Sequence, residues 1–250
     1  AYIQNFNIMM WINKMIAGML PFMPKDLVWL FSKRYIAGKK IENAIEVSRK
    51  LNQEGMMVTV DLLGEFITEL NQAEDNKNQY LQIIETIQQA GIDGNYSLKP
   101  TMFGLLLEKE ICYAYIREIV AKAASYNNFI RIDMEDSQCV DLEIELFRKI
   151  KSEFPKNVGL VLQAYLKRTH SDIQQMLDLN TAETPVNYRL CKGIYVEPEK
   201  IAYKKYDEIN QHFLEDLELM FKNGIYPGIA THDKFLVDGA LKLIEKYQVP

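Results

Sequence analysis

Short apolar runs that end in polar or charged residues recur along this chain, with helix-like segments between them. They lie near residues 57–62, 96–99, 129–134, 158–163, 187–191 and 226–230. Helical periodicity fills the intervals, at about residues 41–51, 74–90, 108–125, 137–154, 199–222 and 235–247, with a short helix opened by Ser171. Regular strand–helix alternation predicts a parallel sheet, and strands that end in reactive side chains indicate a (β/α) barrel.

The pattern also fixes several expected helix ends. Gly91 follows an apolar helical face and is predicted to be the left-handed residue after that helix. Ser137 is predicted to cap the helix that stops before Pro155, and Ser171 to Gln174 has the spacing of a capping box.

Six strand–helix units are visible, whereas a closed barrel of this type needs eight strands. We therefore expect an α/β fold: a distorted (β/α)8 TIM barrel with an N-terminal helical arm, in which the last two strands and the last helix are missing from this chain. Residues 1–45 are assigned to the arm and residues 46–250 to the incomplete barrel. On this interpretation the natural protein continues past Pro250.

The arm is apolar, but Lys14, Pro21, Pro24, Lys25 and Asp26 interrupt it, so a membrane span is not expected. Short amphipathic helices that cover one barrel face fit the pattern, and contact with a membrane surface stays open as an alternative. The start of the chain shows no secretory signal, and we expect a cytoplasmic location, with a peripheral position at the inner face of the cell membrane left open.

Composition narrows the range of functions. The net charge of −5 argues against nucleic acid as the main partner. The three cysteines show neither metal nor disulfide spacing, and the three histidines show no metal-ligand spacing, so no metal is assigned.

Side chains at the strand ends supply the candidate chemistry. Asp133 is expected to share a face with Arg131 and Glu135, either as a paired-carboxylate site or as an ion-pair layer. Lys99 could hold an anionic group or form a Schiff base. Donors and cations at the later strand ends suit a nucleotide-bearing ligand with a flat polar ring: Gln163, Arg189, Lys192, Gly193, Thr231 and His232.

These motifs resemble the proline dehydrogenases. The matching segments are Asp-Met-Glu at 133–135, Val-Leu-Gln-Ala-Tyr at 161–165, Arg-Leu-Cys-Lys-Gly-Ile-Tyr at 189–195 and Ala-Thr-His-Asp at 230–233, with Ser-Leu-Lys at 97–99 in agreement. The resemblance covers essentially the whole chain, in order.

The resemblance implies an FAD-dependent, monofunctional enzyme that oxidises L-proline to Δ1-pyrroline-5-carboxylate and passes electrons to a membrane quinone. It implies that Lys99 binds the proline carboxylate and that Asp133 and Arg189 are catalytic. Implied FAD contacts are Met134, Gln163, Arg189, Lys192, Gly193, Ile194, Thr231 and His232. An arginine pair that the family carries on its last helix has no counterpart here, so weak proline binding is expected.

Three other interpretations remain open from the residues themselves. Lys99 or Lys192 could form a Schiff base in an aldolase-type lyase, and Asp133 with Glu135 could hydrolyse a glycoside. The third is a non-catalytic fragment whose N-terminal helices bind a membrane or a partner.

Overall fold

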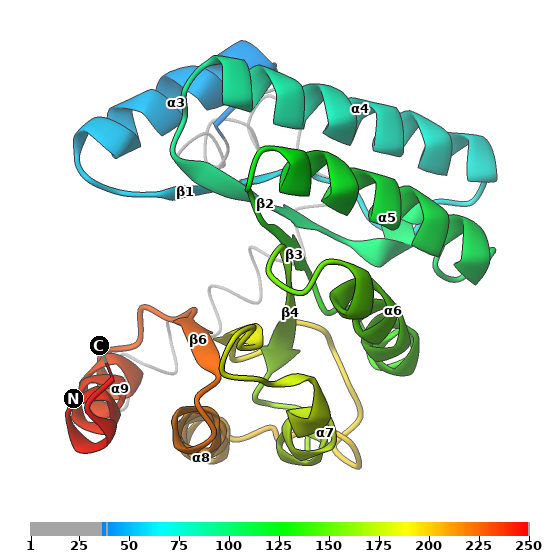
Figure 1. Ribbon diagram of the computed structural model, residues 1–250. Helices are drawn as coiled ribbons and strands as arrows, with labels where there is room; N and C mark the ends of the chain where they lie inside the picture. Colours follow the sequence, from blue (N-terminus) through cyan, green and yellow to red (C-terminus); the bar gives the residue numbers. More distant parts are fainter. Residues whose placement is uncertain (1–36, 39, 250) are drawn as a thin grey trace, which may run out of the picture.

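The chain forms a six-stranded parallel sheet in which consecutive strands are neighbours. The computed structural model describes residues 37, 38 and 40–249. The sheet order is β1-β2-β3-β4-β5-β6, and every neighbouring pair is parallel. The strands are β1 (Val58–Asp61), β2 (Gly94–Leu98), β3 (Ile130–Ile132), β4 (Val158–Gln163), β5 (Asn187–Cys191) and β6 (Tyr226–Ile229). Figure 1 shows that the sheet is curled, with helices on its convex side.

Helices connect the strands. They are α3 (Ile41–Gln53), α4 (Leu70–Gln89), α5 (Lys109–Ser125), α6 (Val140–Glu153), α7 (Thr169–Gln175), α8 (Tyr206–Lys222) and α9 (Lys234–Tyr247). Short 3-10 turns follow β2 at Pro100–Phe103 and α7 at Leu177–Leu179. Neighbouring helices pack pairwise, α4 on α5 and α8 on α9 among them (Figure 1). Strand–helix alternation with consecutive strands adjacent is what the apolar pattern predicts.

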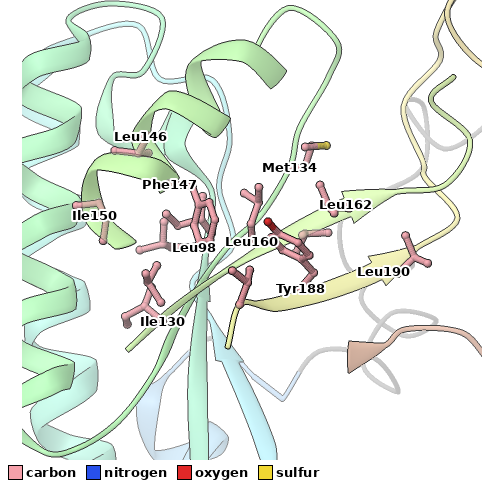
Figure 2. Close-up of a cluster of buried hydrophobic side chains, with 14 of the residues drawn as sticks. Leu98, Ile130, Met134, Leu146, Phe147, Ile150, Leu160, Leu162, Tyr188 and Leu190 are labelled. Carbon is pink, nitrogen blue, oxygen red and sulfur yellow. The ribbon is translucent and has the colours of Figure 1, made fainter. Parts of the chain in front are cut away.

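The core lies between the middle strands and the helices outside them. Every residue of β3 and β4 is buried, which explains their near-continuous apolar sequence. Figure 2 shows Leu98, Leu160 and Tyr188 beside Phe147 of α6. The rings of Phe147 and Tyr188 lie 6.0 Å apart between centroids. Removing either aromatic side chain would cost about 3–5 kcal/mol by cavity formation.

Most element boundaries follow the sequence pattern. The predicted bounds of β4 and β5 are confirmed, and α4 ends at Ala90 with Gly91 in the left-handed region at φ 64°. Glycine reaches that conformation without the strain that a Cβ atom would introduce. The helix therefore stops where the glycine permits the chain to reverse.

Four predicted helix starts are wrong, and the first of them is that of α4, which begins at Leu70 and not near residue 74. Ser137 does not cap α6, because its backbone nitrogen and hydroxyl both donate to the Glu197 carboxylate, at 2.6 and 2.7 Å. α7 begins at Thr169, so Ser171 lies inside the helix. α8 begins at Tyr206. Residues 199–205 before it form turns, and Ala202 in these turns pairs with Leu166 in an isolated antiparallel bridge. At Ser137 the long-range contact with Glu197 overrides the local capping signal.

The predicted arm, residues 1–45, lies mostly outside the described residues. Its described end includes the first turn of α3. Within the described part of the chain, no helix is both long and apolar enough to cross a membrane.

Candidate active site

The carboxyl ends of the parallel strands meet at one edge of the sheet, and the charged side chains gather there. Lys99 directly follows β2, Asp133 directly follows β3, and Arg189 lies inside β5. Apolar strand residues anchor each backbone in the core, so these polar side chains emerge where the burial ends. The topology thus brings three residues that are distant in sequence to one place.

Asp133 is the centre of this group. Its Oδ1 lies 2.6 Å from Arg189 Nη2, and its Oδ2 lies 3.1 Å from Lys99 Nζ. Ser97 completes the set, because its hydroxyl donates to Asp133 Oδ1 and accepts a hydrogen bond from Arg189 Nη2 at 2.8 Å. We call Lys99, Asp133, Arg189 and Ser97 the Asp133 cluster. The ion pairs are partly buried, so water screens them less than it screens surface pairs.

Lys99 also faces a second carboxylate. Asp61, the last residue of β1, lies 3.5 Å from Lys99 Nζ through its Oδ2. Burial lowers the pKa of Lys99, but Asp133 and Asp61 raise it by more, and the net direction is upward. The ammonium group is therefore charged at neutral pH.

Arg131 and Glu135 do not join Asp133, contrary to the expected shared face. The Arg131 guanidinium crosses Gly159 and donates to Asn187 Oδ1 at 2.9 Å, where a Cβ at Gly159 would lie 3.1 Å from Arg131 Nη1. Glu135 is fully buried and accepts hydrogen bonds from the nitrogen and hydroxyl of Thr101. β3 ends at Ile132, so strand alternation no longer sets where residues 133–135 point.

A hollow with a volume of about 600 Å³ opens beside β5 and β6. Five of the predicted cofactor residues line it: Lys192, Gly193, Ile194, Thr231 and His232. Its remaining lining residues are Cys191, Tyr206, Ala230, Asp233 and Lys234. A hollow of this size can hold a small organic ligand.

Lys192 is fixed at the wall of this hollow. Its Nζ lies 2.5 Å from Asp233 Oδ2 and 3.9 Å from the centre of the Tyr206 ring. Asp233 also accepts hydrogen bonds from the Tyr206 hydroxyl and from Asn210, and it caps α9 by accepting from Phe235 N at 3.0 Å. Lys192 and Tyr206 hold the pKa of Asp233 well below its ordinary value.

Gly193 lets the backbone pass close to an aromatic ring. Its φ is +112°, and an added Cβ would lie 2.1 Å from the Tyr165 ring. Only glycine fits there, on both conformational and steric grounds. Gly193 therefore lets the chain that follows β5 pack directly against the Tyr165 ring.

Met134 and Gln163 lie deeper than the other predicted cofactor residues. Met134 is 5% exposed and belongs to the core, as Figure 2 shows. Gln163 is 1% exposed, and its amide nitrogen donates to the Glu135 carbonyl oxygen at 2.8 Å. Gln163 thus ties the end of β4 to the β3–α6 connection.

The thiols are unsuited to nucleophilic chemistry. Burial raises the pKa of Cys191 to about 11 and raises those of Cys112 and Cys139 further. These groups stay protonated at neutral pH and fill space. Among the described residues, no group of three or more His, Cys, Asp or Glu side chains is placed to hold a metal ion.

Two of the histidines have side-chain partners. His170 Nδ1 lies 3.0 Å from Asp216 Oδ1, and His212 stacks on Tyr203 with ring centroids 3.9 Å apart. Both lie on helices outside the sheet, away from the Asp133 cluster.

Sequence reasoning missed three contributors to the site. Asp61 could have been found, because it ends an apolar run as the other candidate residues do. Tyr206 opens α8, and no local pattern connects it with Lys192. Tyr195 lies beyond β5, and its hydroxyl donates to Glu65 Oε1 at 3.4 Å, which links the connections after β5 and β1.

The arrangement suits an anionic ligand that spans two sub-sites. The Asp133 cluster offers Lys99 and Arg189, and the hollow offers Lys192 with the backbone around Gly193. The two lie next to each other because Arg189 and Lys192 leave the same strand.

Comparison with known proteins agrees with this geometry. The family model described as proline dehydrogenase matches residues 44–250. The chain is 33% identical over 221 residues to "Proline dehydrogenase 1" of Bacillus subtilis, covering 88% of this chain and 71% of the relative. It is 33% identical over 224 residues to "Proline dehydrogenase" of Deinococcus radiodurans, with the same coverage of each chain.

A solved structure shares the fold. Proline utilization A from Bdellovibrio bacteriovorus, inactivated by N-propargylglycine, superposes with a TM-score of 0.83 at 24% identity. The match covers 90% of this chain and 28% of that much longer one. The family match and the two curated relatives together show that the chain belongs to the proline dehydrogenase family of oxidoreductases.

Proposed function

We propose that this protein oxidises L-proline to Δ1-pyrroline-5-carboxylate, with hydride transfer from proline C5 to N5 of FAD and onward transfer of electrons to a membrane quinone. The observation that carries the proposal is the Asp133 cluster. Two cations from β2 and β5 converge on one carboxylate at the carboxyl edge of the sheet. The family and its named relatives supply the reaction class.

Lys99 is the proposed partner of the proline carboxylate. Its ammonium group has three hydrogens, and two face Asp133 and Asp61 at 3.1 and 3.5 Å. The third is left for a substrate oxygen. A charge-assisted hydrogen bond of this kind contributes about 1.5–3 kcal/mol.

Asp133 is the proposed catalytic carboxylate of the site. It also positions two cations, Lys99 and Arg189. It aligns Lys99 and Arg189 while offsetting their mutual repulsion. The two cations, Lys99 and Arg189, are matched in number by two carboxylates, Asp133 and Asp61. Binding of a proline carboxylate then depends on orientation rather than on excess charge.

The hollow beside β5 and β6 is the proposed FAD site. The chemistry of the lining supports the fit, since the Lys192 ammonium group, the Thr231 hydroxyl and the backbone at Gly193 are donors that suit a phosphate. Lys192 and His232 would contact the cofactor with Gly193, Ile194 and Thr231. Met134, Gln163 and Arg189 would also contact the cofactor, although Met134 and Gln163 are buried.

When bound, FAD supplies the acceptor for the hydride that leaves proline C5. The protein's task is to hold the substrate, exclude water and stabilise charge. Arg189 is proposed to lie near the flavin N5, where a fixed cation favours the negative charge of the reduced ring.

We also propose that the curled sheet is part of a (β/α)8 barrel, as the family resemblance implies. In that arrangement the Asp133 cluster would face the barrel mouth. Contact with a membrane quinone would take place at or near that mouth, and L-proline would enter by the same route.

The competing chemistries fit less well. A Schiff-base lysine needs a lowered pKa, whereas the carboxylates beside Lys99 raise its pKa. Glycoside hydrolysis needs two accessible carboxylates, but Glu135 is fully buried and bonded to Thr101. Asp133 alone cannot act both as the general acid and as the base or nucleophile.

One experiment tests the proposal. The protein is purified, loaded with FAD and mixed with L-proline without oxygen. Loss of the oxidised flavin absorbance, with formation of an imine that o-aminobenzaldehyde traps, supports it. FAD that binds but is never reduced by proline would contradict it, and D-proline serves as the control substrate.

A further inference from the structure

Tyr80 lies where a barrel helix meets the edge of the sheet. It belongs to α4, its side chain is fully buried, and its ring packs against Phe103 with centroids 5.6 Å apart. α4 lies along β1 and β2 in Figure 1. The hydroxyl group of this helix residue reaches the sheet, where it donates to Ser97 O.

That hydroxyl is inserted into the hydrogen-bond ladder between β1 and β2. Val58 N donates to Asp93 O at 3.2 Å, and the register pairs Asp61 with Ser97. A parallel ladder repeats every two residues, so Leu62 N would next donate to Ser97 O. Instead Leu62 N donates to Tyr80 Oη at 3.2 Å, and Tyr80 Oη donates to Ser97 O at 2.7 Å.

The same hydroxyl holds Asp61. Tyr80 Oη lies 3.1 Å from Asp61 Oδ1, so its single hydrogen faces two acceptors, this carboxylate and the Ser97 carbonyl oxygen. Burial and the neighbouring Asp61 raise the pKa of Tyr80 well above its ordinary value. The hydroxyl keeps its hydrogen at neutral pH and can anchor the carboxylate.

Asp61 connects Tyr80 to Lys99. One carboxylate oxygen faces Tyr80, and the other faces Lys99 Nζ at 3.5 Å. Lys99 is thus held from the β1 side by Asp61 and from the β3 side by Asp133. A long lysine side chain has many rotamers, and two fixed partners restrict them.

We propose that Tyr80 and Asp61 are positioning residues for Lys99, which direct its free hydrogen toward the substrate carboxylate. The substrate part of this inference rests on the proposed function. The anchoring of Lys99 does not, because it is a property of the protein alone. Neither Tyr80 nor Asp61 touches the hollow beside β5 and β6.

Tyr80→Phe is the main test variant, because it keeps the ring and removes the hydroxyl. Tyr96→Phe is the matched control: Tyr96 is also fully buried, and its hydroxyl donates to Ile84 O at 3.4 Å, away from Lys99. Asp61→Asn is a second variant, which keeps the side chain's size and removes its charge.

The first measurement is the rate at which an amine-specific acylating reagent labels Lys99, followed by peptide mass spectrometry. We expect Tyr80→Phe and Asp61→Asn to label about fivefold faster than the wild type and Tyr96→Phe, by loss of roughly one hydrogen bond. Labelling of Lys99 at the wild-type rate in both variants would overturn the proposal. This measurement needs neither FAD nor proline.

The second measurement is proline turnover in the FAD-loaded enzyme. Tyr80→Phe should raise the KM for proline about fivefold and leave kcat and FAD affinity close to the wild type. In a Lys99→Ala background, Tyr80→Phe should add nothing to KM, because its effect passes through Lys99. An additive effect would overturn the proposal. If proline never reduces the wild-type flavin, the proposed function fails, while the labelling still decides the role of Tyr80.

Discussion

Arg189 in β5 and Asp133 at the end of β3 form an ion pair across the intervening strand, with Arg189 Nη2 2.6 Å from Asp133 Oδ1. Ser97 from β2 bonds to both side chains. Three strands thus fix one guanidinium group at the carboxyl edge of the sheet. A side chain held this firmly can stabilise developing charge without reorganising during the reaction.

Replacing Arg189 by methionine should slow flavin reduction by roughly 100-fold, the usual cost of losing a preorganised charged donor. Asp133 keeps Lys99 as a partner, so the fold should survive. Anaerobic stopped-flow reduction by proline measures the rate, and fluorescence titration measures FAD affinity, which should also weaken. Arg189→Lys, which keeps the charge, should lose less; reduction at the wild-type rate in Arg189→Met would exclude the proposed role.

Replacing Lys99 by alanine should raise the KM for proline by roughly 10- to 100-fold, since a charge-assisted hydrogen bond is lost. FAD affinity should stay unchanged, because Lys99 does not line the hollow beside β5 and β6. Steady-state kinetics and FAD titration separate the two effects. Lys222→Ala is the control: Lys222 pairs with Glu218 at the surface, and its removal should change neither value.

Much of this site follows from the sequence, because β4 and β5 begin and end where the apolar runs do. Lys99 and Asp133 meet at one edge as strand-end residues of a parallel sheet should, and Arg189 reaches them from inside β5. Glu135 was misjudged because β3 stops at Ile132 and strand alternation stops with it. Ser137 was misjudged because Glu197, distant in sequence, takes its hydroxyl.

The lining of the hollow beside β5 and β6 was likewise only partly predictable from the sequence. Lys192, Gly193 and Thr231 were found because polar residues follow apolar strands. Tyr206 was not, since its contact with Lys192 depends on where α8 begins. Tyr80 was missed for a further reason: an apolar helix position gives no sign that its hydroxyl enters the sheet.

Gly193 and Gly224 offer a matched pair of glycine substitutions. Both have positive φ, at +112° and +66°, but only Gly193 has an atom, in the Tyr165 ring, within 2.1 Å of an added Cβ. Gly224→Ala should therefore cost about 1 kcal/mol of backbone strain, and Gly193→Ala should cost more. Thermal unfolding measures the stability of each variant, and FAD titration measures how well the hollow still binds the cofactor. An equal loss of stability in Gly193→Ala and Gly224→Ala would contradict the account of Gly193.

Glu135 should make stability depend on pH. Burial raises its pKa from 4.5 to about 7, although hydrogen bonds from Thr101 oppose this. The pKa is higher in the folded state, so this stability contribution is complete below the unfolded pKa and is lost as pH rises through about 7. The shift corresponds to a loss on the order of 3 kcal/mol.

Glu135→Gln mimics the protonated acid and should remove that dependence. Urea unfolding at about pH 5 and about pH 8 measures it, and the variant should lose less stability across this interval than the wild type. Glu110→Gln, at an exposed position on α5, is the control and should behave as the wild type does. An equal loss of stability in Glu135→Gln and in the wild type across this interval would contradict the assignment.

The most direct test of the central claim is the visible absorption spectrum of the FAD-loaded protein, recorded without oxygen before and after L-proline is added. The account predicts a flavin spectrum that L-proline bleaches and D-proline leaves unchanged, with bleaching slowed in Arg189→Met. A protein that takes up no FAD, or whose bound flavin keeps its absorbance when L-proline is present, would contradict it.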